Sequence, residues 1–232
     1  PIDLLLGPDE SLSDPLEDIS RRFLDDTTRY WRNWSRSLSV PFEYQDVVIR
    51  AAITLKLCAF EETGAVIAAL TTSVPEHADS GRNWDYRFCW LRDAYFVVQA
   101  LNRLGATKTM EGLITYISNI VARTGGGHIQ PVYSITTNPN LDEWITHVLK
   151  GYRRMGSVRS GNQASAHMQS GVYGQVMLVA TQAFFDRRLF LHDLVELFER
   201  RSLAGVQPWA VYDKPDSGLW ELRSATKGLR HY

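Results

Sequence analysis

The stretch RNWDYRFCWLRDA, residues 82–94, says more than any other about the fold and use of this chain. Aromatic and charged side chains alternate in it: Trp84, Tyr86, Phe88 and Trp90 stand among Arg82, Asp85, Arg87, Arg92 and Asp93. A sugar ring has apolar C–H faces and a rim of hydroxyls, so its site needs flat aromatic surfaces beside groups that form several hydrogen bonds. A buried cluster of salt bridges among aromatic rings would have the same composition. The stretch alone leaves both interpretations open.

Helical periodicity dominates the rest of the chain. Apolar side chains recur at three- and four-residue steps from Asp14, which can cap a helix ahead of Pro15, to Leu38. We expect further helices over residues 47–58, 91–104, 110–121, 172–185 and 191–204, and strand-like runs only at 64–69 and 129–135. Gly105 is a natural end for the helix that begins at Leu91. The pattern predicts an all-α protein of paired helices.

Three long connections interrupt these helices, at residues 71–89, 123–140 and 151–169. Loops longer than about 12 residues in a compact domain are usually functional or disordered. These are rich in Trp, Tyr, Arg, Asp, Asn and Gly, a composition that argues against disorder. We therefore expect a helical scaffold that carries a recessed ligand site on its loops.

Composition narrows the classes of function. The 232 residues are 44% hydrophobic and 22% charged, as in a globular protein, and a formal net charge of −1 favours neither nucleic acid nor an anionic membrane as a partner. No apolar run approaches the roughly 20 residues of a membrane span. Cys58 and Cys89 lie in apolar surroundings, so we expect buried free thiols. With no secretory signal pattern, we expect a cytoplasmic protein, and a chain that begins at Pro1 as part of a longer product.

The histidines form neither an HExxH motif nor a close pair of ligands, so we expect no metal and no cofactor. A second stretch, PDSGLWELR at residues 215–223, points to catalysis instead. It places Glu221 directly after Trp220. A carboxyl group beside a large indole is partly desolvated, which raises its pKa and suits it to general-acid catalysis. A Trp-Glu dipeptide alone is usually structural.

Together these stretches resemble glycoside hydrolase family 15, the family of glucoamylases, glucodextranases and some bacterial trehalases. The likeness runs through AALTTSVPEHADSGRNWDYRFCWLRDA at 68–94, GYRRMGSVRSGNQA at 151–164, VYGQV at 172–176 and GLWELR at 218–223. It implies an (α/α)6 barrel and hydrolysis of α-glucosidic bonds with inversion, acting on a glucan, an oligosaccharide or trehalose. By position, Arg92 and Asp93 match the pair that holds the hydroxyls of the terminal glucose, with Trp90 as a pocket wall. Glu221 matches the general acid, with Trp220 beside it.

The resemblance also implies how the chain is organised. Residues 1–12 resemble the end of a preceding β-sandwich domain or a linker, and residues 13–232 resemble the N-terminal portion of the barrel, about half of it. The family's general base lies farther downstream than this sequence reaches. We therefore expect the chain alone to be inactive, and to pair with the missing half of the barrel or as a homo-oligomer.

Two positions depart from the family pattern, which usually has an acidic residue at Gly171 and often Gln at His167. Two other classes of function stay open at this point. One is a non-catalytic remnant that binds carbohydrate. The other is a structural helical module, which leaves the clustered Arg, Asp and Trp residues unexplained.

Overall fold

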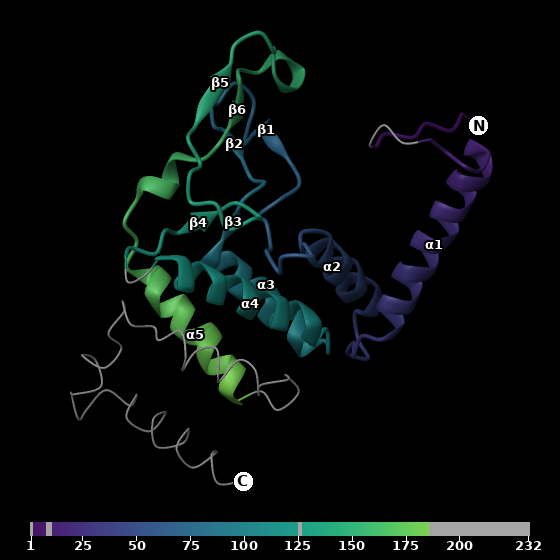
Figure 1. Ribbon diagram of the computed structural model, residues 1–232, viewed down its shortest axis with the longest axis horizontal. Helices are drawn as coiled ribbons and strands as arrows, with labels where there is room; N and C mark the ends of the chain where they lie inside the picture. The colour runs from purple at the N-terminus through teal and green to yellow at the C-terminus, as the bar shows by residue number, and fades with distance from the viewer. Residues whose placement is uncertain (1, 8–10, 125–126, 186–232) are drawn as a thin grey trace. The chain divides into compact units, whose positions relative to one another are not determined.

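The computed structural model of the chain describes residues 2–7, 11–124 and 127–185 (Figure 1). Two units are distinguished, Pro1–Ile53 and Thr54–Tyr232. The helices are α1 (Leu16–Arg36), α2 (Gln45–Leu57), α3 (Leu91–Arg103), α4 (Thr107–Thr124) and α5 (Gly171–Phe185), with the 3-10 turns η1 (Tyr152–Arg154) and η2 (Gln163–Ala166). The strands are β1 (Thr72–Pro75), β2 (Asn83–Asp85), β3 (Cys89–Trp90), β4 (Val132–Tyr133), β5 (Trp144–Thr146) and β6 (Val158–Ser160).

The first unit contains α1 and most of α2. Pro15 is the N-cap of α1, and Asp14, predicted to cap it, instead accepts a hydrogen bond from Arg22 at 3.0 Å. Ile19 is the buried residue of this helix. The Trp31 and Trp34 rings meet edge to face at 5.7 Å between centroids, so these two residues pack on each other as their helical spacing predicts.

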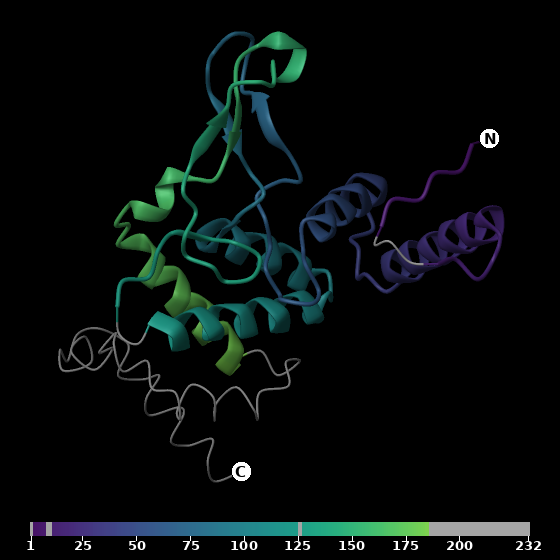
Figure 2. The same cartoon turned by 45° about the horizontal axis from the view of Figure 1, so that its top comes forward.

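In the second unit, α3 packs against α4 and α5, and α4 also contacts α5 (Figure 2). The apolar faces of the three helices meet in one core. Its largest fully buried side chains include Leu91, Met110, Leu113, Tyr116 and Ile117. Burial of each large apolar side chain contributes about 1.5–3 kcal/mol, so this core is the main source of stability of the unit.

Two glycines fix the way the chain enters and leaves these helices. Gly105 has a φ of 87° and its N–H bonds to the Asn102 carbonyl at 2.9 Å, which confirms the predicted end of α3. Gly64 lies against Gly112 of α4, and a Cβ on Gly64 would stand 1.9 Å from the Gly112 carbonyl oxygen. The connection that precedes β1 can therefore cross α4 because Gly64 lacks a side chain, and Gly112 leaves little room for one, since a Cβ there would stand 3.1 Å from the Gly64 Cα.

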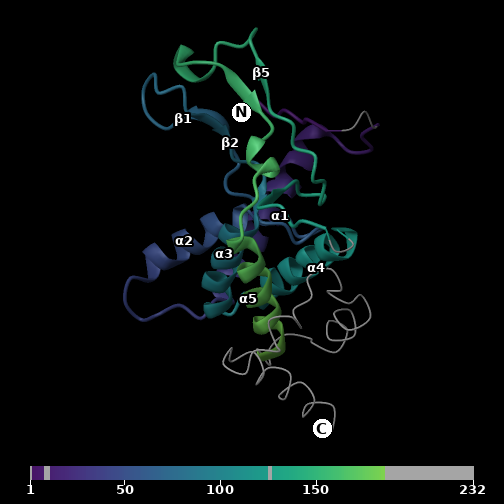
Figure 3. The ribbon, with the colours of Figure 1, turned by 90° about the vertical axis from the view of Figure 1, so that its left-hand side faces the viewer.

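The long connections correct one expectation. Two connections predicted as loops contain strands: β1, β2 and the first residue of β3 fall within 71–89, and β6 falls within 151–169. The antiparallel pairs are β1 with β2, β3 with β4, and β5 with β6. Strand β6 also contacts β1 and β2, so the two hairpins form one small body at one end of the helices, which we call the hairpin module (Figure 3). The strands are short and carry polar residues on both faces, so they lack the period-two hydrophobic pattern that identifies a strand in sequence.

Helices make up most of the regular secondary structure in the described part of the chain, as predicted, but the six strands mean that it is not all-α. None of the described helices is both long and apolar enough to span a membrane. The run at 129–135 contains β4, whereas the run at 64–69 contributes only an isolated bridge between Ala59 and Val66. The predicted helix at 191–204 lies outside the described residues. The boundary predicted between residues 12 and 13 stays a prediction.

Candidate active site

The site predicted at the start of α3 stands on a buried anchor. Cys89 and Trp90 pair with Tyr133 and Val132, and the N–H of Leu91 bonds to the carbonyl of Pro131 at 3.1 Å. Cys89 and Leu91 are fully buried. The chain therefore enters α3 with its backbone held by β4 and its apolar side chains fixed in the core.

Arg92 and Asp93 project from this anchor. Their side chains are 55% and 58% exposed, and the Arg92 Nε lies 4.0 Å from the Asp93 Oδ2. At that separation the pair is too long for a hydrogen bond, and neither side chain forms one with any other described residue. Asp93 stands in the first turn of α3, where the helix dipole favours a carboxylate. Among the described residues, the two groups therefore have donors and acceptors that no hydrogen bond uses.

The charged residues earlier in the same stretch have a different role. Asp85 is buried, and its carboxylate accepts hydrogen bonds from the Arg87 Nε at 2.9 Å and the Arg87 Nη2 at 2.8 Å. The hydrogen bonds that Arg87 donates to Asp85, together with the negative charge of that carboxylate, raise the pKa of the Arg87 guanidinium. Arg82 pairs with Glu76 at 2.6 Å. In this part of the stretch the charged residues form salt bridges, as one of the two interpretations expects, but only the Asp85 carboxylate is buried, and the Arg82–Glu76 pair lies on the surface.

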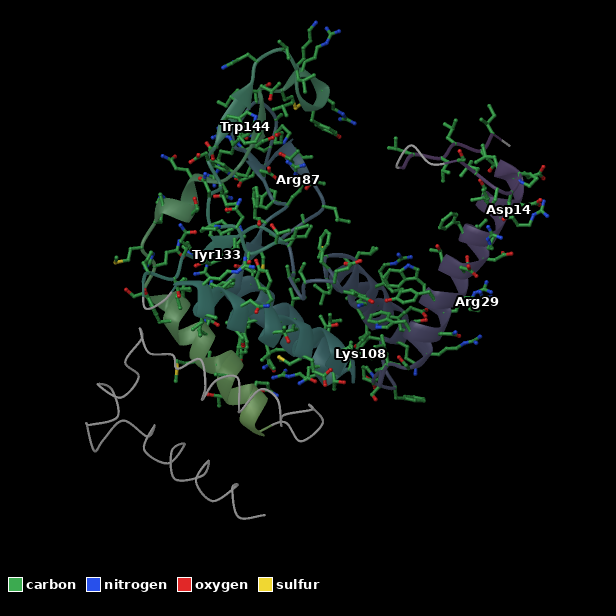
Figure 4. The ribbon with its side chains drawn as sticks, viewed as in Figure 1. Asp14, Arg29, Arg87, Lys108, Tyr133 and Trp144 are labelled. Carbon is green, nitrogen blue, oxygen red and sulfur yellow. The ribbon has the colours of Figure 1, made fainter. Side chains whose placement is uncertain are left out.

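The Asp85 cluster also joins two stretches that are distant in sequence, residues 82–94 and 151–164. The Gly161 N–H donates to Asp85 Oδ2 at 3.2 Å, and the Asn162 side chain reaches the Asp85 carbonyl at 3.5 Å. The Asn83 amide donates to the Met155 and Ser157 carbonyls. The middle block, residues 151–164, is thereby fixed against the block at 82–94. Figure 4 shows Arg87 in the hairpin module, farther from the helices than Tyr133.

Arg159 forms a second link between these blocks. Its guanidinium pairs with Glu143 and lies 4.9 Å from the centre of the Trp84 ring. The Arg159 carbonyl accepts hydrogen bonds from the Thr72 hydroxyl at 2.6 Å and from the Ser73 hydroxyl, and the Arg159 N–H donates to the Ser73 hydroxyl oxygen. Sequence analysis did not single out Arg159 or Glu143, because a pair formed between two loops leaves no signature in residue spacing.

Tyr173 joins the start of α5 to the connection between α4 and β4, through His128 and Ile129. Its hydroxyl lies 2.9 Å from His128 Nδ1 and accepts the Ile129 N–H at 3.3 Å.

His167, one of the two departures from the family pattern, is exposed and follows η2. Gly171, the other, is exposed at the first residue of α5, and a Cβ there would meet nothing within 4 Å. An acidic side chain at position 171 therefore fits without rearrangement.

Trp220 and Glu221 lie outside the described residues. Their convergence with Trp90, Arg92 and Asp93 on one concavity stays a prediction. Among the described residues, no group of three or more His, Cys, Asp and Glu side chains is placed to hold a metal ion. The structure thus places the predicted hydroxyl-binding pair, and it separates that pair from the structural charges that precede it.

Comparison with known proteins places the chain among glycosidases. A trehalase of Thermoplasma volcanium is 34% identical over 207 residues, which cover 88% of this chain and 32% of the relative. A trehalase of Thermoplasma acidophilum is 32% identical over 206 residues, covering 88% and 34%. A trehalase of Mycobacterium tuberculosis is 31% identical over 200 residues, covering 85% and 29%. The chain thus spans about a third of the length of these relatives. No solved structure matches it.

The family model described as "Glycosyl hydrolases family 15" matches residues 43–232. That range contains the buried anchor, the open pair at the start of α3 and the middle block that Asp85 holds in place. The chain belongs to glycosyl hydrolases family 15.

Proposed function

We propose that the protein takes part in the hydrolysis of α-glucosidic bonds, with trehalose as the first substrate to test. The open pair of Arg92 and Asp93 is the observation that carries this proposal. Both side chains are more than half exposed, while Cys89 and Leu91 beside them are fully buried. A carboxylate and a guanidinium that stand on a fixed backbone, and that form no hydrogen bond with another described residue, suit the adjacent hydroxyls of a terminal glucose. The names of the relatives favour trehalose over a glucan.

In the proposed site, Trp90 and Trp220 wall the glucose and Glu221 is the general acid. Glu221 donates its proton to the glycosidic oxygen as the bond to the anomeric carbon breaks. A second carboxylate removes a proton from a water molecule, which attacks the opposite face of the sugar ring. The two carboxyl groups stand about 6.5–9.5 Å apart in such an inverting enzyme, which leaves room for the water. The complete (α/α)6 barrel that would hold both is part of this proposal.

The resemblance matches no residue of this sequence to the second carboxylate. A general base contributes typically about 10²–10⁴-fold to rate. We therefore expect the 232-residue chain by itself to release no glucose from trehalose, maltose or isomaltose at a useful rate. Activity of the chain alone equal to that of an intact relative would show that the base has been misplaced.

The direct test is a chimera in which this chain replaces the matching third of the Thermoplasma volcanium trehalase. Hydrolysis of trehalose with inversion releases one α- and one β-glucose, which NMR distinguishes before the anomers equilibrate. Retention would release only the α-anomer at first. In the chimera, Asp93→Ala should abolish turnover, because it removes the carboxylate that accepts the glucose hydroxyls. Each tenfold loss in rate corresponds to about 1.4 kcal/mol of lost transition-state binding. Near-unchanged kcat/KM for Asp93→Ala would contradict the assigned role.

A protein that binds sugar without hydrolysing it is the second candidate. Gly171 favours it, because this exposed position at the start of α5 accommodates an acidic residue and carries none. In the same chimera, this alternative predicts that glucose binds and that trehalose stays intact. Restoration of turnover by Gly171→Asp would then identify position 171 as the cause.

A further inference from the structure

The end of the hairpin module that points away from the helices carries exposed apolar side chains that the proposed hydrolysis does not use. Residues 144–154, which we call the tip, run from β5 through the turn that follows it to η1 (Figure 1, Figure 3). Its large apolar side chains are 37–87% exposed: Trp144, Ile145, Val148, Leu149 and Tyr152. Figure 4 shows Trp144 farther from the helices than Arg87. Apolar side chains gathered on one protruding segment mark a surface that binds a partner.

The tip is also basic. It contains Lys150, Arg153 and Arg154, all exposed, and residues 144–160 include no Asp or Glu. None of these three cations forms an ion pair with a described carboxylate, and the Arg153 guanidinium lies 5.3 Å from the centre of the Tyr152 ring. The formal net charge of −1 is a sum over the whole chain and does not describe this segment. The tip therefore presents three positive charges beside its exposed apolar side chains.

The acidic residues nearby leave this charge in place. Asp142 and Glu143 precede β5, so they lie at the opposite end of that strand from the turn that follows it. In the other hairpin, which contacts η1 through β1, Glu76 pairs with Arg82 at 2.6 Å. Asp79, exposed in the same turn as Glu76, adds a single carboxylate against three cations. This end of the hairpin module is therefore net positive.

The backbone holds the tip in a fixed shape. A Cβ on Gly151 would stand 2.0 Å from the Gly156 carbonyl oxygen, so the chain returns on itself here with backbone against backbone. The Asn83 side chain fastens this loop by donating to the Met155 and Ser157 carbonyls. A segment whose backbone is already held loses little conformational freedom when it binds.

The size and composition of the tip favour a lipid surface over a protein as the partner. A stable protein–protein interface uses about 20–30 residues on each side, more than the tip contains. Protein interfaces are also depleted in lysine. Trp and Tyr beside aliphatic and basic residues are typical of segments that lie at the boundary of an anionic bilayer, where apolar side chains enter the lipid and cations stay among the headgroups.

We propose that the tip binds the surface of an anionic phospholipid bilayer. Val148 and Leu149 enter the boundary between the headgroups and the acyl chains, while Lys150, Arg153 and Arg154 bind the lipid phosphates. The protein attaches reversibly in this way, and no helix needs to span the membrane. This binding does not rest on the proposed function.

The charges and apolar side chains of the tip set the expected affinity. Each Lys or Arg near an anionic surface strengthens binding about fivefold, so three give about a hundredfold and half-binding near about 10 mM lipid. Transfer of Val148 and Leu149 out of water adds at least about tenfold. We therefore expect half of the protein to be bound at about 1 mM accessible lipid.

The test is co-sedimentation of the 232-residue chain with vesicles made of equal parts phosphatidylglycerol and phosphatidylcholine. Vesicles of pure phosphatidylcholine are the neutral probe and should bind the chain at least tenfold more weakly, because they lack the net negative charge that attracts the three cations. Salt at about 1 M should release the chain from the anionic vesicles, since it screens charges beyond about 3 Å.

Variants of the basic residues locate the binding surface. The combination of Lys150→Asn, Arg153→Asn and Arg154→Asn should weaken binding by about a hundredfold. Asn suits these positions because the φ angles of residues 153 and 154 are 49° and 65°, a region that Asn tolerates. The matched control combines Arg32→Gln, Arg36→Gln and Arg103→Gln at exposed helix positions. It removes the same charge outside the tip and should bind as the unchanged chain does.

A second variant tests the apolar part of the tip. Val148→Ser with Leu149→Ser should weaken binding at least about tenfold, because the serine side chains gain little from entering lipid. Both positions are exposed, so thermal unfolding should be nearly unchanged. The chimera with the Thermoplasma volcanium trehalase repeats the titration in a complete enzyme and should bind the anionic vesicles as the chain does.

Four results would overturn the proposal. The first is equal binding to neutral and anionic vesicles, or binding to neither. The second is an equal loss of binding in the matched control, which would make the attraction a property of the whole chain. The third is a chimera that does not bind, which would show that the rest of a complete enzyme covers the tip. The fourth is displacement from vesicles by polyglutamate together with unchanged binding of the apolar variant, which would make the partner an acidic protein. None of these outcomes depends on whether trehalose is hydrolysed.

Discussion

The two halves of the stretch at 82–94 have similar composition and opposite surroundings. In the first half, the Asp85 carboxylate has no exposed surface and receives Arg87 at 2.8 Å. In the second half, the Asp93 carboxylate is 58% exposed and stands 4.0 Å from Arg92. The difference shows that the mixture of residues does not decide their role. An Asp–Arg pair that satisfies itself holds the fold, and one that is left unsatisfied on a rigid base is available to a ligand.

Asp85 is the position at which a substitution should have the largest effect on stability. We expect Asp85→Ala to lower the free energy of unfolding by about 3 kcal/mol, because it leaves the Gly161 N–H and the Arg87 guanidinium without their buried acceptor. The estimate takes the low end for a broken buried pair, since Arg87 is half exposed. Urea denaturation measures the change. A loss below 1 kcal/mol would mean that the two blocks do not depend on this carboxylate.

High pH tests the buried anchor that separates the two halves. Burial raises the pKa of the Cys89 thiol to about 12, from 9.0 in an exposed thiol. Below pH 9 the thiol is protonated in both the folded and the unfolded chain, so its ionisation takes nothing from the free energy of unfolding. As pH rises above 9, it ionises in the unfolded chain only, so stability falls.

The ionisation of Cys89 alone should lower the free energy of unfolding by about 1.4 kcal/mol at pH 10. Burial also raises the pKa of Tyr116, which adds to the loss at higher pH. Cys89→Ala should flatten the pH dependence between pH 9 and 10, whatever its effect at neutral pH. An unchanged slope in that variant would mean that the thiol reaches solvent in the folded protein.

Position 171 offers a smaller, stabilising effect. Gly171→Asp should raise the free energy of unfolding by about 0.3–1 kcal/mol more than Gly171→Asn, because only the charged side chain interacts with the dipole at the start of α5. Both side chains fit, since a Cβ there meets nothing within 4 Å. Thermal unfolding of the two variants at low salt measures the difference, and high salt should reduce it.

The smallest effect sharpens the comparison most. Asp93→Ala should lower the free energy of unfolding by about 0.3 kcal/mol, the low end for a carboxylate at a helix start, because the side chain is exposed and forms no hydrogen bond with a described residue. Measured beside Asp85→Ala, it separates the carboxylate that holds the fold from the one proposed to bind sugar. A loss as large as that of Asp85→Ala would place Asp93 among the structural charges.

Sequence patterns were sufficient for the described helices of the second unit but not for its loops. The bounds expected for α3, 91–104, agree with Leu91–Arg103 because apolar periodicity and Gly105 define both ends locally. The hairpin module was missed, since its strands contain few alternating apolar residues. Asp85 could not be told from Asp93 in sequence, because its further partner, Gly161, is 76 residues away. The resemblance did separate them, by assigning only Arg92 and Asp93 to the sugar.

The separation between Asp85 and Gly161 also sets an order of events during synthesis. The Asp85 carboxylate emerges from the ribosome 76 residues before the backbone amide that completes its site. At about 5–20 residues per second, that interval lasts about 4–15 s. Throughout it, α3 and α4 can form from local contacts, while the hairpin module has no second hairpin to pack on. The nascent chain therefore displays the pair proposed to bind sugar before it has the means to hold the blocks around them, and a chaperone that shields apolar helix faces has those seconds in which to act.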